Sequence, residues 1–323
     1  MNAKEVDKTL ELFAQMMIEK IQSIKSDWTK PWFTENTLQW PCNLSGRNYN
    51  GFNALMLLMH CEKEEYKVAR FCTFNALQSL NSPGKPFVSV LKGAKSFPII
   101  FTSFTCIHQE TRKKIKYEEY KELTEEEKLL YKVYPKLQVF RVFNIAQTNL
   151  SESRPELWER LTEGTKPYPR QSEDFCFDEV DEMLKNDGWI CPVKIVHQDE
   201  AYYSQSRNEI VVPEKKQFKS GEAFYGTLLH EMTHSTGAKE FLDRLKPAAF
   251  GSREYAREEL VAELGSALVA QKYGILTHIK EESCAYLKSW LESLKESPDY
   301  IRTVLGDVKK AVTLITQRLE TAC

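Results

Sequence analysis

The chain has 323 residues, of which 42% are apolar and 28% are charged, and its formal net charge is −2. These proportions are ordinary for a soluble globular protein, and the length is sufficient for two domains. No apolar run approaches the length of a membrane span, so the composition excludes an integral membrane protein.

Charge is divided unevenly along the chain. Residues 1–150 carry 21 Lys and Arg against 16 Asp and Glu, whereas residues 151–323 carry 23 against 30. A basic first half joined to an acidic second half suggests that a polyanion-binding module is attached to a second module with another function. The excess of basic residues in the first half is modest, and ordinary solvated charges on the protein surface explain it almost as well.

The amino terminus, residues 1–23, places Leu10, Phe13, Met17 and Ile21 at helical spacing among charged residues. This pattern predicts an amphipathic helix and not a signal peptide. The eight cysteines are scattered and form no C-x-x-C pair. We therefore expect free thiols, a reducing cytoplasm, and no zinc site built from cysteines.

The remainder of residues 1–150 predicts a mixed α+β domain. Aromatic and basic segments broken by Pro, Gly and Asn predict loops, and a highly charged segment predicts a solvated helical excursion. We expect loops at 28–33 and 40–53, helices at 53–61 and 75–80, strands at 66–74, 87–91, 97–104 and 139–145, a basic turn at 92–95, and the excursion at 109–130.

Residues 151–174 predict a linker, because Pro155, Pro167 and Pro169 interrupt them. A second domain is expected over 175–323.

The second domain is expected to begin with short alternating elements. Its pattern predicts a helix ending at Asn186, strands at 190–197 and 208–213, and a helical end over 283–319. Pro213 closes the second strand and suits an edge position, because proline lacks an amide N–H. An edge strand before a catalytic helix can pair with an extended peptide substrate.

The next feature is an H-E-x-x-H motif, which runs from His230 to His234 inside a predicted helix. Imidazoles four residues apart lie on one helical face, so both can ligate one metal ion. Glu231 can then take a proton from a metal-activated water, as in zinc-dependent peptidases. The plainer alternative is an amphipathic helix with two core or surface histidines.

A third ligand is expected from the helix predicted over 252–268, because a catalytic zinc keeps three protein ligands and one open position. Glu259 and Glu263 flank its apolar stripe one turn apart, and two stacked carboxylates repel unless a positive charge lies between them. We expect Glu259 to ligate the metal and Glu263 to orient a histidine. The reverse assignment stays open.

Other candidates near the motif are weaker. Glu254 and Glu258 are expected to be solvated, or paired with Arg253 and Arg257. His278 is held as an alternative third ligand.

Both halves together resemble the ArdC antirestriction family of plasmids and conjugative elements. In the first half the resemblance is carried by Trp28, Trp32, 41–43, 46–53, 92–96 and 142–147. In the second half it is carried by Tyr202, 210–213, Phe218, Tyr225, 230–234, 236–237, 244–245, 250–252 and 255–263. One departure is Ser235, where the family often has an aromatic residue. The resemblance implies an amino-terminal α+β domain that binds single-stranded DNA and a carboxyl-terminal zincin-like metallopeptidase domain.

The resemblance also implies candidate DNA contacts. Cations would meet phosphates while aromatic rings stack on unpaired bases. The candidates are Lys30, Trp32, Arg47, Tyr49, Lys92 and Lys95.

Two functions are compatible with these features. The first is a DNA-associated zinc peptidase that protects the DNA of a mobile element during conjugation, with zinc replaceable by manganese or cobalt and with a substrate associated with restriction or DNA. In it Tyr202, Tyr203 or Tyr225 stabilises the oxyanion. The second is a protein that coats single-stranded DNA and whose metal domain is structural or regulatory.

Overall fold

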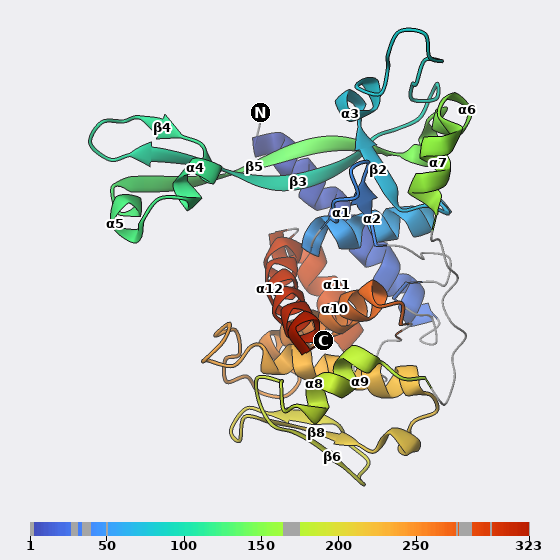
Figure 1. Cartoon of the computed structure of the whole chain (residues 1–323). Helices are drawn as coiled ribbons and strands as arrows, with labels where there is room; N and C mark the ends of the chain where they lie inside the picture. Colours follow the sequence, from blue (N-terminus) through green and yellow to red (C-terminus); the bar gives the residue numbers. More distant parts are fainter. Residues whose placement is uncertain are drawn as a thin grey trace.

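The computed structural model describes residues 3–26, 32–33, 40–49, 51–163, 175–275, 277, 286–297 and 299–322, whose arrangement is shown in Figure 1. Helices and strands are mixed throughout, which confirms the α+β class. No helix in this part of the chain is both long and apolar enough to cross a membrane. The cysteines that the structure describes as free thiols are Cys42, Cys61, Cys72, Cys106, Cys176 and Cys191.

The amino-terminal half contains a five-stranded sheet with the order β1-β2-β5-β3-β4. β1 is parallel to β2, and the other neighbours are antiparallel. The strands are β1 (Cys42–Asn43), β2 (Arg70–Thr73), β3 (Phe97–His108), β4 (Lys114–Ile115) and β5 (Tyr131–Asn144). The helices that accompany them are α1 (Ala3–Ser26), α2 (Gly51–Lys63) and α3 (Phe74–Gln78). α1 is the predicted amphipathic helix, since Phe13, Met17 and Ile21 are buried.

β3 and β5 form a two-stranded ribbon that extends from the body of the molecule (Figure 1). Their pairing runs from Phe97 opposite Val142 to His108 opposite Tyr131. The far end carries β4, α4 (Tyr117–Lys121) and α5 (Glu125–Lys128). The charged segment 109–130 is therefore only partly helical, and it folds back onto the strands.

The strand expected at 87–91 is not present, and Val90 makes only an isolated bridge to Thr148. In this segment the side chains of two asparagines accept hydrogen bonds from backbone amides that a neighbouring strand would otherwise accept. The amide N–H of Val88 donates to Asn81 at 2.7 Å, and that of Ser89 donates to Asn149 at 2.8 Å. Side-chain acceptors of this kind compete with a β-ladder.

Part of the expected linker is helical. After the short 3-10 helix η1 (Ile145–Gln147), the chain forms α6 (Leu150–Ser153) and α7 (Pro155–Thr162). Pro155 opens α7 instead of breaking it, because the first residue of a helix needs no amide N–H. Leu161 is buried, and its carbonyl accepts from Arg70 of β2 at 3.1 Å, so α7 packs on the amino-terminal half.

The carboxyl-terminal half places helices against a three-stranded sheet. The strands are β6 (Val193–Val196), β7 (Tyr202–Ser204) and β8 (Glu209–Pro213). The helices are α8 (Asp178–Lys185), the 3-10 helix η2 (Lys215–Gln217), α9 (Gly221–Ser235), α10 (Arg253–Lys272), α11 (Leu287–Glu296) and α12 (Asp299–Ala322). The apolar stripe of α11 is buried, as expected from its spacing.

The expected edge position of the strand that ends at Pro213 is wrong. The sheet order is β6-β8-β7, so β8 lies in the middle. Pro213 is tolerated there because it is the last residue of the strand, where it pairs with Val196 of the parallel β6. Among the described strands, β7 occupies an edge.

The two halves share one core. A continuous cluster of buried apolar side chains includes Phe13 and Leu57 from the first half together with Trp290 and Val308 from the second. α1 contacts α11 and α12, and α2 contacts α12. A second, smaller cluster of buried apolar side chains lies within residues 68–161 and includes Leu77, Val88 and Leu161. The domain boundaries near 150 and 175 stay predictions.

Candidate metal centre

The two motif histidines lie in the last two turns of α9. Ser220 caps the amino terminus of this helix, because its side chain accepts a hydrogen bond from the amide of Ala223. His230 is 3% exposed, and its Nε2 lies 3.1 Å from Nε2 of His234 on the next turn. Both imidazoles therefore direct the same nitrogen toward one point.

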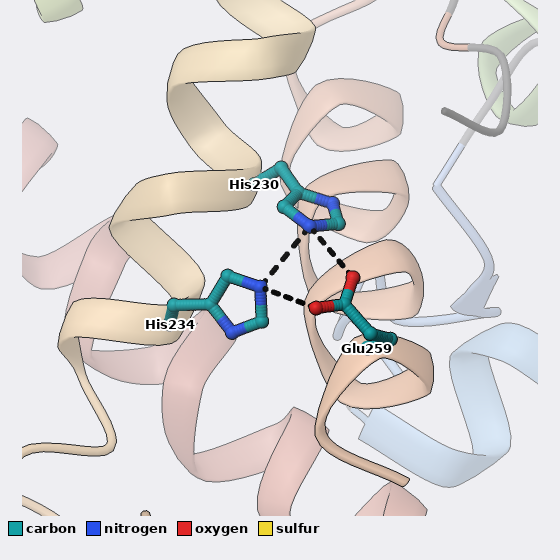
Figure 2. A group of neighbouring side chains, drawn as sticks. All are labelled: His230, His234 and Glu259. Carbon is teal, nitrogen blue, oxygen red and sulfur yellow. Dashed lines mark hydrogen bonds and ion pairs between the residues drawn. The ribbon is translucent and has the colours of Figure 1, made fainter. Parts of the chain in front are cut away.

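α10 brings a carboxylate to that point (Figure 2). Glu259 places Oε2 3.4 Å from Nε2 of His230 and Oε1 3.6 Å from Nε2 of His234. One donor atom from each of the three residues lies within 4.8 Å of the others. Two imidazole nitrogens and a carboxylate form the donor set that many catalytic zinc sites use.

A glycine allows α9 and α10 to approach closely at this place. A Cβ added at Gly265 would lie 2.6 Å from Cγ2 of Thr233, so a side chain there would require Thr233 or the helices to shift. The close approach keeps Glu259 within reach of the histidines.

His234 is oriented from behind by an ion-pair chain. Its Nδ1 lies 3.1 Å from Oε1 of Glu258. Arg244 donates to both oxygens of that carboxylate at 2.8 Å and to the carbonyl of Thr233 at 2.9 Å. The arginine side chain is 3% exposed, so the chain is largely excluded from water.

The expectation that Glu258 is solvated or paired with Arg257 is therefore wrong. Arg257 instead pairs with Asp307 at 2.7 Å, and Arg253 pairs with Glu296 at 2.8 Å. The available signal was Arg244 itself, which belongs to the segments that carry the family resemblance.

His230 faces a second carboxylate on its other side. Oε1 of Glu263 lies 3.5 Å from Nδ1 of His230. The indole N–H of Trp32 donates to Oε2 of Glu263 at 3.3 Å. The geometry thus puts Glu259 at the Nε2 atoms and Glu263 behind His230, and it connects the amino-terminal half to the centre.

The electrostatics of the cluster favour an added positive charge. Burial lowers the pKa of His234, but the carboxylates of Glu259 and Glu258 outweigh this effect and raise the pKa to about 9. Burial raises the pKa of Glu259, whereas His234 and His230 lower it, and the net result is a pKa of about 2. A carboxylate that stays ionised among imidazoles suits a divalent cation.

The centre opens into a cavity of about 1420 Å³ that is lined by His230, Glu231, His234 and Glu259. Glu231 is 3% exposed, so its carboxylate lies in a largely dry position beside the first histidine. A base in such a place can move a proton at a reacting group that enters the cavity.

The three tyrosines proposed for the oxyanion have different surroundings. Tyr225 is 1% exposed and donates to Asp181 at 2.7 Å, so it is part of the core and its assignment is wrong. Tyr202 and Tyr203 line the cavity, although the hydroxyl of Tyr203 donates to Asn208 at 2.8 Å.

Sequence reasoning missed Tyr255. It lines the cavity one turn before Glu259 on α10, and burial together with the Glu259 carboxylate, to which it hydrogen-bonds, raises the pKa of its hydroxyl. A protonated phenol at this position is a hydrogen-bond donor at neutral pH. Its i,i+4 relation to Glu259 was the signal that could have found it.

The expected DNA contacts are scattered. Arg47, Lys92 and Lys95 are exposed. Trp32 is 1% exposed and Tyr49 is 8% exposed, and neither ring can stack on a base from these positions, which corrects their assignment. Both rings are packed in the core. Lys30 and His278 lie outside the described residues.

Two family descriptions match the chain. Residues 7–143 match the N-terminal domain of anti-restriction factor ArdC, and residues 178–304 match a zincin-like metallopeptidase.

Relatives of known sequence differ greatly in length. Two proteins named DNA primase TraC from Escherichia coli are each 28% identical to 93% of this chain, but the chain spans only 19% and 26% of their lengths. An uncharacterized protein, y4eC, of Sinorhizobium fredii is 27% identical over 93% of this chain and 89% of its own length.

Two crystal structures of the antirestriction ArdC protein from the R388 plasmid have the same fold. The metal-free structure superposes with a TM-score of 0.69 at 26% identity and covers 96% of this chain and 98% of the other. The Mn(II)-bound structure has a TM-score of 0.68 at 24% identity and covers 95% and 98%.

Proposed function

We propose that the chain is a DNA-associated peptidase that depends on a divalent metal ion. It belongs to the ArdC-type family of antirestriction proteins and carries a zincin-like domain in its second half, and both findings support the proposal. The observation that carries this proposal is the convergence of His230, His234 and Glu259 beside Glu231 in one cavity.

The metal donors are Nε2 of His230, Nε2 of His234 and the carboxylate of Glu259. Three protein ligands leave a position open for reactants. These donors favour zinc, and manganese or cobalt fits the same set. A bound ion supplies Lewis-acid chemistry, because it polarises a carbonyl and makes water easier to deprotonate.

Glu231 is the general base in this proposal. Its carboxylate takes a proton from the attacking water and returns it to the leaving amine. The hydroxyl of Tyr255 hydrogen-bonds to Glu259. Tyr255, like Tyr202 and Tyr203, lines the cavity and is a candidate for stabilising the oxyanion.

The substrate is proposed to bind as an extended peptide along β7. Tyr202 and Tyr203 of this strand line the cavity, and β7 pairs on one side with β8. Strand addition would place the peptide beside the metal centre, with backbone hydrogen bonds that do not depend on its sequence.

The amino-terminal half is proposed to bind single-stranded DNA. Its excess of 21 Lys and Arg over 16 Asp and Glu within residues 1–150 and its match to the ArdC domain support this assignment. In the cytoplasm such binding would bring the peptidase to DNA of a mobile element during conjugation, and a protein associated with restriction or with DNA would be its substrate. The chain spans only 19% and 26% of the two TraC proteins, so their primase activity forms no part of the proposed function.

The second candidate is a DNA-coating protein whose metal centre has no turnover. Coating alone can oppose restriction nucleases that act on duplex DNA. The buried Glu231 beside two oriented histidines favours turnover, because a purely structural metal does not need a base.

The test uses the intact chain, stripped of metal by a chelator and reloaded with Zn²⁺, Mn²⁺ or Co²⁺. Hydrolysis is followed with a quenched fluorescent peptide library and with unfolded protein, with and without single-stranded DNA. The variant Glu231→Gln should bind metal and DNA as the wild type does and lose about 10²- to 10⁴-fold in rate.

Equal turnover by wild type and Glu231→Gln would refute the catalytic role of this residue. If no reloaded sample hydrolyses any substrate while DNA binding persists, the coating function replaces the peptidase.

A further inference from the structure

We propose that single-stranded DNA binds along one face of the β3–β5 ribbon, an inference that rests on the proposed DNA binding and locates its site. None of the six expected DNA contacts lies on this ribbon. The argument depends on which side chains share a face, on what covers the opposite face, and on the charge of the two strands.

The register of the ribbon assigns each side chain to a face. Directly opposed residues of an antiparallel pair share a face, and the faces alternate along each strand. The open face, as we name it, comprises Phe140 and the pairs Phe101–Gln138, Ser103–Lys136, Thr105–Tyr134 and Ile107–Lys132. Ile99, which lies opposite Phe140, is 1% exposed and belongs to the core, so the open face ends there. The covered face comprises Ile100–Val139, Thr102–Leu137, Phe104–Pro135, Cys106–Val133 and His108–Tyr131.

α4 packs on the covered face. The ring of Tyr117 stacks on Phe104 at 4.3 Å, and the ring of Tyr120 meets Tyr131 at 6.2 Å. Cys106 is 0% exposed beneath this packing. The segment between the strands therefore covers the outer part of this face, around Phe104, Cys106 and Tyr131, whereas Thr102 and Pro135 nearer the body stay exposed.

The open face keeps its aromatic rings in solvent. Phe101 is 41% exposed, Tyr134 is 42% exposed and Phe140 is 40% exposed. Phe101 and Phe140 touch edge to face at 5.6 Å, and Lys132 lies 5.5 Å over the ring of Tyr134. Rings of this size are normally buried, so a row of exposed ones marks a binding surface.

The charge of the two strands favours nucleic acid as the ligand of the open face. β3 and β5 contain Lys132, Lys136 and Arg141 and no Asp or Glu. Lys132 and Lys136 are exposed on the open face between and beside the rings. Because the two strands carry no acidic side chain, they do not repel a phosphate backbone, and the two lysines can each contact one phosphate.

The geometry suits a single strand and not a duplex. From Phe140 to Lys132 along β5 the open face extends for about 26 Å at the rise of a β-strand. Stacking on a ring requires an unpaired base, because bases in a duplex present only their edges. Alternating rings and lysines match the alternation of bases and phosphates in one strand.

The test measures binding of a fluorescein-labelled thymidine oligonucleotide to the intact protein by anisotropy, as a function of salt, with the duplex form as competitor. Two double variants probe the open face: Phe101→Ala with Tyr134→Ala, and Lys132→Gln with Lys136→Gln. The matched controls are Phe74→Ala with Phe87→Ala and Lys67→Gln with Lys85→Gln, which change exposed residues of the same half outside the ribbon.

Loss of the two rings should weaken binding by about 5- to 150-fold for each base that stacks. Loss of the two lysines should reduce the slope of log affinity against log salt by about 1.4. The controls should keep the wild-type affinity and slope.

Wild-type affinity and slope in both ribbon variants, with tight binding by the wild type, would overturn the ribbon site and leave the proposed DNA binding intact. Equal weakening in ribbon and control variants would overturn it as well. If the wild type itself prefers the duplex or binds neither form, the proposed single-strand function fails and the ribbon site fails with it.

Discussion

The metal centre and the β3–β5 ribbon hold their functional side chains in opposite ways. In the centre each histidine has a carboxylate behind it, and that carboxylate is held in turn by Arg244 or Trp32. On the ribbon the backbone ladder positions the side chains, and the rings of Phe101 and Tyr134 remain about two-fifths exposed.

This difference agrees with what each region is proposed to recognise. A metal ion requires donors fixed to within a fraction of an ångström, so rigid support from neighbouring residues is useful. A single strand presents varied bases on a flexible backbone, which exposed rings and lysines can follow. Substitution of the residues that hold the ligands in place should therefore have large effects on stability or metal affinity at the centre. The following experiments test this comparison.

The largest effect is expected from Arg244→Ala. The substitution leaves the Glu258 carboxylate, whose side chain is 14% exposed, without its guanidinium partner. We expect the protein to lose about 3–5 kcal/mol of unfolding free energy, as measured by urea denaturation.

Arg253→Ala is the matched control, because the side chains of Arg253 and Glu296 are 61% and 57% exposed. Solvent screens this pair, so stability should stay close to that of the wild type. Similar losses in the two variants would contradict the supported character of the metal centre.

The second effect concerns the base of the ribbon, where His60 stacks on Phe97 at 4.2 Å. Burial lowers the pKa of His60 to about 4, with Glu64 opposing this shift and Lys63 adding to it. A histidine in the unfolded chain has a pKa near 6.5. As the pH falls from about 6.5 to about 4, His60 is therefore protonated in the unfolded chain but stays neutral in the folded chain. The folded state therefore loses stability in this window.

His60→Phe keeps the ring and removes the titration. Between pH 7 and pH 5 the wild type should lose about 2 kcal/mol more unfolding free energy than the variant does. An identical pH dependence in the two proteins would show that His60 is not held neutral at the base of the ribbon.

The smallest effect is expected from Trp32→Phe, which tests the one contact between the amino-terminal half and the centre described above. Removing the indole N–H leaves Glu263 without the donor at 3.3 Å, so the carboxylate that faces His230 is held less firmly. Metal affinity should fall by about 10-fold, the lower end of the range for residues that orient a ligand.

Trp189→Phe serves as the control, because its N–H donates to the hydroxyl of Ser235 at 3.0 Å and not to a carboxylate of the centre. Its metal affinity should match that of the wild type. A loss of the same size in Trp189→Phe would mean that packing of α9, and not support of Glu263, accounts for the effect.

Local patterns allowed the clustering of His230, His234 and Glu259 to be predicted. His230 and His234 are four residues apart on one helix, and Glu259 and Glu263 are related in the same way on the next, so sequence spacing alone places them on common faces. Their chemistry restricts each position to few residue types, which makes such a pattern recognisable.

Long-range partners could not be predicted in this way. Arg244 lies in an irregular segment between α9 and α10 with no periodic pattern, and Trp32 is 231 residues from Glu263. The ribbon was only partly expected, at 97–104 and 139–145, because the outer parts of β3 and β5 are half exposed on one face and lack the apolar alternation of an ordinary strand.

The most direct test of the central claim is a calorimetric titration of the metal-free protein with Zn²⁺, for the wild type, Glu259→Gln and Glu263→Gln. The donor set described here predicts one ion per chain for the wild type, a loss of about 10- to 100-fold in affinity for Glu263→Gln, and a larger loss for Glu259→Gln. A greater loss in Glu263→Gln than in Glu259→Gln, or no binding by the wild type, would contradict the assignment of His230, His234 and Glu259 as the metal ligands.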